Sequence, residues 1–206
     1  MSSLLHRSRR LVACLAVVAP LLIAAPTASA RNPCGQRVIE NPFAQWNDVA
    51  DYFLINQGDF AAGATAWDLG GGALVAENNP YSLHAQESAS LSVSEGESAT
   101  APMVCVGVND PTMRFFVRNT GSATGALKVE VTYRDLDYVT HTAELAVLTP
   151  ADAGDAWTPS PTIDLAVPLV AQYDPDLTPV WFRFTAEGAG SSWLVDDVYV
   201  DPYGKG

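Results

Sequence analysis

The sequence has little histidine, cysteine and positive charge, and these shortages narrow the functions open to it. The 206 residues include three histidines, three cysteines, and eleven Lys or Arg against 23 Asp or Glu. They contain no H-E-x-x-H zinc motif, G-x-S-x-G nucleophile elbow or phosphate-binding P-loop. The formal net charge of −12 opposes nucleic acid as a partner, because phosphate binding needs a cationic surface. We therefore expect a non-enzymatic protein whose charge is compatible with neutral sugars or cations.

The sequence also lacks long apolar runs, apart from a short one near its start. Leu11–Ala25 is apolar, follows the basic stretch His6–Arg10 and precedes the small residues Ala28–Ala30. This pattern predicts a cleaved export signal over residues 1–30, and the run is too short to span a membrane. We expect a mature chain from Arg31, secreted and either free or associated with the cell wall. Loss of the leader's three arginines would change the formal net charge from −12 to −15.

Removal of the leader leaves an even number of cysteines. Cys14 would be lost, and Cys34 and Cys105 would remain. An even pair in an oxidising compartment indicates a disulfide, which would tie the start of the mature chain to the later strands. Neither cysteine stands in a C-x-x-C motif or beside a histidine, so we expect no thiol chemistry.

Alternation with a period of two residues dominates the chain after residue 58. In Met113–Arg118, Leu127–Arg134 and Val180–Thr185 every second residue is apolar and most of the residues between are polar, which is typical of antiparallel strands with one solvated face. Further strands are expected at residues 73–76, 88–93, 104–108, 139–148, 163–167 and 193–203. No helix of ordinary length is predicted. About eight or nine strands at this spacing predict an all-β fold, an antiparallel β-sandwich.

The first part of the mature chain, residues 31–57, is predicted to pack on the sandwich formed by residues 58–206. It has enough apolar mass to do so, in Phe43, Trp46, Tyr52, Phe53 and Leu54. Asn47–Tyr52 is expected to form a single helical turn capped by Asn47.

The last predicted strand, Trp193–Tyr203, carries two adjacent carboxylates, Asp196 and Asp197. Apolar residues on both sides of the pair predict burial on both faces of the strand, and buried carboxylates need a partner. One interpretation is a bound cation. The other is that one aspartate faces solvent while the second accepts hydrogen bonds from the backbone or from an arginine such as Arg183.

Three short segments are similar to motifs of a known family. Gly58–Phe60 followed by Trp67 is similar to an N-G-x-F-E…W opening, Ser88–Val93 to an early S-L-x-V strand, and Leu194–Val198 to a closing strand with a D-D pair. Together they resemble the jelly-roll carbohydrate-binding modules with a galactose-binding-like fold. The resemblance implies a jelly-roll topology and a glycan as ligand.

Residues 58–203 also resemble a group of uncharacterised secreted proteins of actinobacterial type. Met113–Asn119 and Asp196–Tyr203 are the segments that carry this second resemblance. It implies no known activity.

The resemblance to the sugar-binding family implies a structural calcium that joins the first and last strands. Its ligands here would be Asp59, Asp196 and Asp197, together with backbone carbonyls, since calcium takes six to eight oxygens. Ala61 stands where the family has a glutamate, so one carboxylate of that set is missing. Calcium at these three aspartates is therefore a hypothesis, and no other cofactor is predicted.

Glycan binding needs aromatic rings that stack on sugars and polar groups that bind the hydroxyls. The candidate ligand-binding residues are Trp157, Trp181 and Tyr81. Trp157 lies among loop residues and is expected to be exposed, whereas Trp67 matches a position that the family uses for its core. Trp181 would either pack on the second face of its strand or lie in the binding groove.

Three functions are thus compatible with the sequence. The first is a secreted, non-catalytic carbohydrate-binding module. The second is a structural or protein-interaction domain of the cell exterior, without a small ligand. The third is a hydrolase, which would require two facing carboxyls in a cleft. The sequence predicts no particular oligomeric state.

Overall fold

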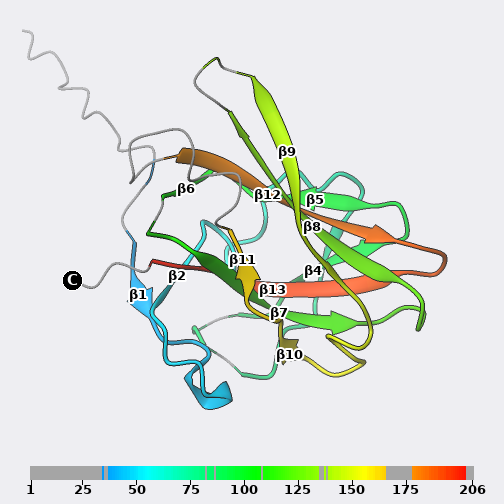
Figure 1. The fold of residues 1–206 in the computed structure, drawn as a ribbon. Helices are drawn as coiled ribbons and strands as arrows, with labels where there is room; N and C mark the ends of the chain where they lie inside the picture. The colour runs from blue at the N-terminus through cyan, green and yellow to red at the C-terminus, as the bar shows by residue number, and fades with distance from the viewer. Residues whose placement is uncertain are drawn as a thin grey trace, which may run out of the picture. The chain divides into compact units, whose positions relative to one another are not determined.

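The computed structural model describes residues 34, 37–81, 83–85, 87–107, 109–134, 137, 139–165 and 178–202. The predicted leader at residues 1–30 lies outside this part of the chain. The described residues form two β-sheets in which every pairing between named strands is antiparallel (Figure 1). The predicted all-β, antiparallel β-sandwich is confirmed. No described helix is long and apolar enough to cross a membrane.

The larger sheet has eight strands arranged around the last strand of the chain. Its path is β1 (Ile39–Glu40), β2 (Tyr52–Leu54), β13 (Ser192–Asp201), β4 (Ser90–Ser94) and β3 (Ala73–Val75). β7 (Thr112–Asn119) pairs with the other edge of β13 and with the short strands β10 (Thr158–Pro159) and β11 (Ile163–Asp164). Figure 1 shows β13 lying between β4 and β7. β13 therefore lies in the centre of the larger sheet, which agrees with the prediction that both its faces are buried.

The second sheet has five strands and contains the clearest alternation in the sequence. Its strands are β5 (Ser98–Thr100), β6 (Val104–Val106), β12 (Thr178–Glu187), β8 (Ala126–Arg134) and β9 (Thr140–Leu148). β12 pairs with β8 along one edge and with β5 and β6 along the other. Leu127, Val129 and Val131 of β8 and the alternate residues Val180, Phe182 and Phe184 of β12 are buried, and the residues between them are not.

The main core lies between the inner faces of the two sheets. It includes Phe115, Val117, Leu127, Val129, Val131, Phe182, Phe184, Trp193 and Val195, all fully buried. A second apolar cluster of Phe43, Tyr52, Phe116 and Tyr199 packs on the other face of the larger sheet. Residues from the segment before β2 thus cover that face.

The helical turn predicted at Asn47–Tyr52 is wrong. A 3₁₀ turn forms earlier, at Ala44–Trp46, and Asn47 ends it with a φ of 63°. Asparagine tolerates this left-handed conformation better than most residues, so it terminates the turn and does not begin one. Tyr52 already belongs to β2.

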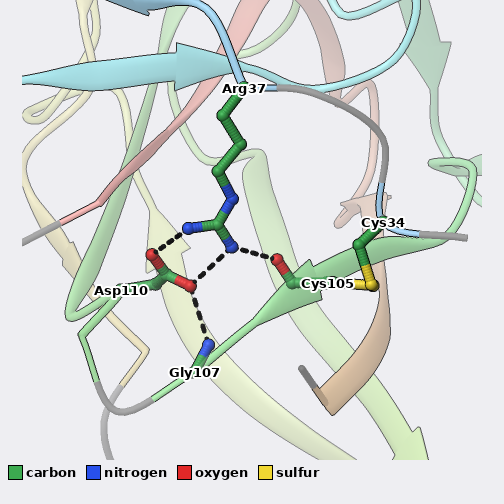
Figure 2. Close-up of a disulfide and its surroundings, with 5 residues drawn as sticks. All are labelled: Cys34, Arg37, Cys105, Gly107 and Asp110. Atoms are coloured by element: carbon green, nitrogen blue, oxygen red, sulfur yellow. Dashed lines mark hydrogen bonds and ion pairs between the residues drawn. A yellow bond between two sulfur atoms is a disulfide. The ribbon is translucent and has the colours of Figure 1, made fainter. Parts of the chain in front are cut away.

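The predicted disulfide between Cys34 and Cys105 is confirmed, with a Cα–Cα distance of 5.2 Å. Figure 2 shows an ion pair beside it, in which Arg37 donates to both carboxylate oxygens of Asp110, at 2.8 and 2.9 Å. Arg37 also donates to the Cys105 carbonyl at 2.7 Å, and the Gly107 amide donates to Asp110 at 2.7 Å. The segment before β1 is therefore attached to β6 by the disulfide and one hydrogen bond, and to the loop after β6 by the Arg37–Asp110 ion pair.

Candidate functional site

The two adjacent aspartates lie at an irregularity in β13. The register between β13 and β7 shifts between Asp196 and Tyr199, and Asp197 has a φ of 49°. Such a positive φ is unusual for an aspartate and re-aims its side chain relative to a regular strand. Both Asp196 and Asp197 are 0% exposed, so the interpretation in which one of them faces solvent is wrong.

Asn79 is the main partner of both carboxylates. Asp196 Oδ2 accepts from the Asn79 amide and side chain at 3.2 and 2.9 Å, and its Oδ1 accepts from the Asp197 amide at 3.0 Å. Asp197 Oδ2 accepts from Asn79 Nδ2 at 2.7 Å. The suggested partner Arg183 donates instead to Ser98 Oγ, in the five-stranded sheet.

The environment of the pair disfavours the presence of two charged carboxylates. Burial, and secondly the charge of Asp197, raise the pKa of Asp196 to about 8. Burial, and secondly the charge of Glu87, raise the pKa of Asp197 to about 7. Each proton held in this way lowers the cost of burying two neighbouring carboxylates.

One oxygen of the pair faces a further group of polar side chains. Asp197 Oδ1 is buried without a hydrogen-bond partner and lies 3.9 Å from His84 Nδ1. One ligand atom each of Asp59, His84 and Glu87 lies within 4.8 Å of the others. We name these four residues the carboxylate–histidine cluster: Asp59, His84, Glu87 and Asp197.

His84 is held between two carboxylates. Its Nδ1 lies 2.8 Å from Glu87 Oε1, and its Nε2 lies 2.8 Å from Glu40 Oε2, which also accepts from the Tyr199 hydroxyl at 3.1 Å. Burial lowers the pKa of His84, but the bonds and charges of Glu40 and Glu87 outweigh it and raise the pKa. The imidazole is thus fixed in orientation by groups on both sides.

The structure brings together only part of the predicted calcium set. Asp59 and Asp197 belong to the cluster, whereas Asp196 is occupied by Asn79 and by the backbone. His84 and Glu87 were missed, because they stand in an irregular segment without periodicity. The unpartnered Asp197 oxygen fits a cation, but a cluster with a ring nitrogen and without Asp196 does not fit the all-oxygen calcium site that the resemblance implies.

Of the predicted ligand-binding residues, Trp181 lies on the outer face of the five-stranded sheet. It is partly exposed, it stands opposite Thr132 of β8, and its ring makes no hydrogen bond or aromatic contact with any described residue. Its cross-strand neighbours on the β8 side are polar. Arg183 stands opposite Glu130, and the Thr132 and Thr142 hydroxyls are 3.0 Å apart.

Tyr81 and Trp157 lie together, against the other sheet. The Tyr81 hydroxyl donates to the Trp157 carbonyl at 2.8 Å, and the Tyr81 ring lies 4.6 Å from Trp46 and 5.0 Å from Phe116. Trp157 is only partly exposed, and its ring nitrogen is buried, so the expectation of an exposed loop residue is wrong. These aromatics pack against the second apolar cluster. Trp67 lies in the main core, as predicted.

No family model and no curated protein matches the sequence. Solved structures do match. One is a Clostridium thermocellum endo-1,4-β-D-xylanase structure that contains the CBM22-1 and GH10 modules in complex with xylohexaose. It matches at 15% identity with a TM-score of 0.50, over 72% of this chain and 27% of that chain. The CBM22-1 xylan-binding domain of Paenibacillus barcinonensis Xyn10C also matches, at 18% identity and with a TM-score of 0.47. This match covers 72% of this chain and 94% of that domain. The chain thus spans about a quarter of the first of these structures, and the likeness shows the jelly-roll β-sandwich fold.

Proposed function

We propose that the protein is a non-catalytic carbohydrate-binding module whose binding surface is the outer face of the five-stranded sheet. The observation that supports this most is the position of Trp181 on β12. It is a large aromatic ring, partly exposed among polar side chains and without aromatic contacts to the described residues. Aromatic rings in such settings provide the flat apolar surface on which a pyranose stacks.

The neighbours of Trp181 supply the polar half of a sugar site. Thr132 stands opposite it on β8 and shares a hydrogen bond with Thr142 on β9. Two residues further along each strand, on the same face, Arg183 and Glu130 offer a donor and an acceptor. These groups lie on paired strands and not on loops, which holds them in fixed positions relative to the ring.

The fold and the compartment are consistent with this function. The structurally similar xylanase modules were solved with xylohexaose, which suggests a β-linked xylan as the first ligand to test. The disulfide supports a location outside the reducing cytoplasm. The excess of acidic residues suits a neutral polysaccharide better than an anionic one.

Retention on polysaccharides tests the proposal. We expect the wild-type protein to be retained on xylan or another neutral polysaccharide of a panel, and Trp181→Ala to lose that retention. Trp157→Phe is the matched control, because Trp157 packs against the other sheet. Loss of binding in Trp157→Phe but not in Trp181→Ala would move the site to the other sheet. Absence of retention on every polysaccharide would contradict the proposal and favour a protein-interaction role.

A further inference from the structure

The carboxylate–histidine cluster joins three segments that are far apart in the sequence. Asp59 lies between β2 and β3, His84 and Glu87 lie between β3 and β4, and Asp197 lies in β13. The ligand atoms of the first three lie within 4.8 Å of one another, and Asp197 Oδ1 lies 3.9 Å from His84 Nδ1. Zinc bonds of about 2.1 Å place tetrahedral ligands about 3.4 Å apart, so small side-chain movements of Asp59, His84 and Glu87 would bring these three ligands to that spacing.

Asp197 provides independent evidence that the cluster has a ligand. Its side chain is fully buried, and its Oδ1 has no hydrogen-bond partner, although Oδ2 accepts from Asn79. A buried carboxylate oxygen without a partner costs free energy that a bound cation would recover. The positive φ of Asp197 and the register shift beside it add backbone strain at this residue.

One of the two ring contacts of His84, the bond from Nε2 to Glu40, is of the kind that a metal-binding histidine makes. A histidine that binds a metal through one ring nitrogen usually donates the other N–H to a carboxylate, which fixes the tautomer and the ring orientation. His84 Nδ1 faces the cluster, 2.8 Å from Glu87 Oε1 and 3.9 Å from Asp197 Oδ1, and Nε2 lies 2.8 Å from Glu40 Oε2. An ion bound at Nδ1 would replace its contact with Glu87 by bonds from both residues to the metal. The Tyr199 hydroxyl donates to the same oxygen of Glu40 and holds it in place.

The types of donor atom decide which cation fits. Calcium takes six to eight oxygens, whereas the cluster offers three carboxylates and one imidazole nitrogen. Four ligands of these types are typical of zinc and similar divalent transition metals. We propose that the carboxylate–histidine cluster binds one divalent cation of this class, such as Zn²⁺, in preference to Ca²⁺. Glu40 is then a positioning residue that orients His84.

The proposal is independent of glycan binding, and a thermal and calorimetric experiment tests it. Protein without a histidine tag is purified after expression of the full chain and treated with a chelator. It is then titrated with Zn²⁺ or Ca²⁺ in a calorimeter and melted with each ion. We expect one zinc site and a rise in Tm of about 5 °C or more at hundred-fold excess over Kd. Ca²⁺ should leave Tm unchanged.

Variants locate the ion. His84→Gln and Glu87→Gln should abolish the high-affinity zinc site and the rise in Tm. His141→Gln should retain both, because His141 lies on β9 in the other sheet and controls for adventitious binding to imidazoles. If His84→Gln does not fold, two tests of the zinc site remain: the Glu87→Gln variant, and the comparison of Zn²⁺ with Ca²⁺ on the wild type. No zinc binding, an equal or larger response to Ca²⁺, or an undiminished zinc response in folded His84→Gln or Glu87→Gln would overturn the proposal.

Discussion

At the scale of single residues, Arg114 on β7 connects the segment before β2 to the larger sheet. It forms an ion pair with Asp48 and donates twice to the Ser160 carbonyl, at 3.0 and 2.8 Å. Its guanidinium also lies 4.7 Å from the centre of the Phe43 ring. The Tyr52 hydroxyl donates to Asp48 at 2.9 Å. Burial raises the pKa of Asp48, but the bonds from Arg114 and Tyr52 outweigh it and hold the pKa below 3.8.

Substitution of Asp48 should therefore lower the free energy of unfolding by an amount that depends on pH. We expect Asp48→Asn to lower the free energy of unfolding at pH 7 by about 1–3 kcal/mol, because it removes charge-assisted hydrogen bonds. Since the folded-state pKa is depressed, this contribution is complete above the unfolded-state pKa of about 3.9 and is lost as pH falls through the folded value.

Urea unfolding of the wild type and of Asp48→Asn, at pH 7 and at pH 2 to 3, measures the loss of stability and its dependence on pH. The exposed Asp155→Asn is the matched control and should change stability by less than about 0.5 kcal/mol. A difference between wild type and Asp48→Asn that stayed constant down to pH 2 would contradict this account of the ion pair.

At the scale of secondary-structure elements, β12 separates the core from the proposed binding surface. Val180, Phe182 and Phe184 are fully buried, whereas Trp181 and Arg183 point to the opposite face. Neighbouring residues of one strand therefore have different roles, because successive side chains of a strand alternate between faces.

Substitutions at adjacent positions of β12 should separate stability from binding. Phe182→Ala should lower the free energy of unfolding by about 3–5 kcal/mol, since it leaves a cavity in the core. Trp181→Ala should lower it by about 1 kcal/mol or less and yet abolish glycan retention. Urea unfolding measures the stability of each variant, and retention assays on the folded fraction measure its glycan binding. A Trp181→Ala variant as unstable as Phe182→Ala would show that Trp181 is a structural residue.

The strands were the part of the fold that sequence analysis could predict. The alternation of Leu127–Arg134 and Val180–Thr185 corresponds to β8 and β12, and the doubly apolar end of the chain corresponds to β13. Strand periodicity is local, so it is visible without knowledge of pairing. The short strands β1, β2, β5 and β10 escaped prediction, because two or three residues scarcely display a period; the two-residue β11 was found only as part of the apolar stretch 163–167.

The candidate cation site could be predicted only in part. The D-D pair and Asp59 stood out through a family resemblance and through carboxylates in an apolar strand. Asn79 and His84 did not, since Asn79 is 117 residues from Asp196 and reaches it only in the folded chain. The direction in which the Asp197 side chain points likewise depends on the register shift between β13 and β7. No local sequence pattern encodes that shift.

At the scale of the whole molecule, the start of the described chain is attached to the sandwich at the Cys34–Cys105 disulfide, which closes a separation of 71 residues. The Arg37–Asp110 ion pair lies beside it. Loops of this length give a chain-entropy stabilisation of about 4 kcal/mol, often less in practice.

Replacement of both Cys34 and Cys105 by serine should lower the free energy of unfolding by up to about 4 kcal/mol. The adjacent ion pair and the apolar contacts of the same segment should keep the variant folded. Urea unfolding with and without a reductant checks this: the reductant should destabilise the wild type and leave the double variant unchanged. Equal stability of the two oxidised proteins would contradict the prediction.

The most direct test of glycan binding at Trp181 is a calorimetric titration of the folded wild-type protein and of folded Trp181→Ala. The ligands are xylohexaose and oligosaccharides of any other glycan that retains the protein. We expect saturable binding to the wild type and none to Trp181→Ala at the same concentrations. Equal affinity in the two proteins, or no binding of any glycan by the wild type, would contradict it.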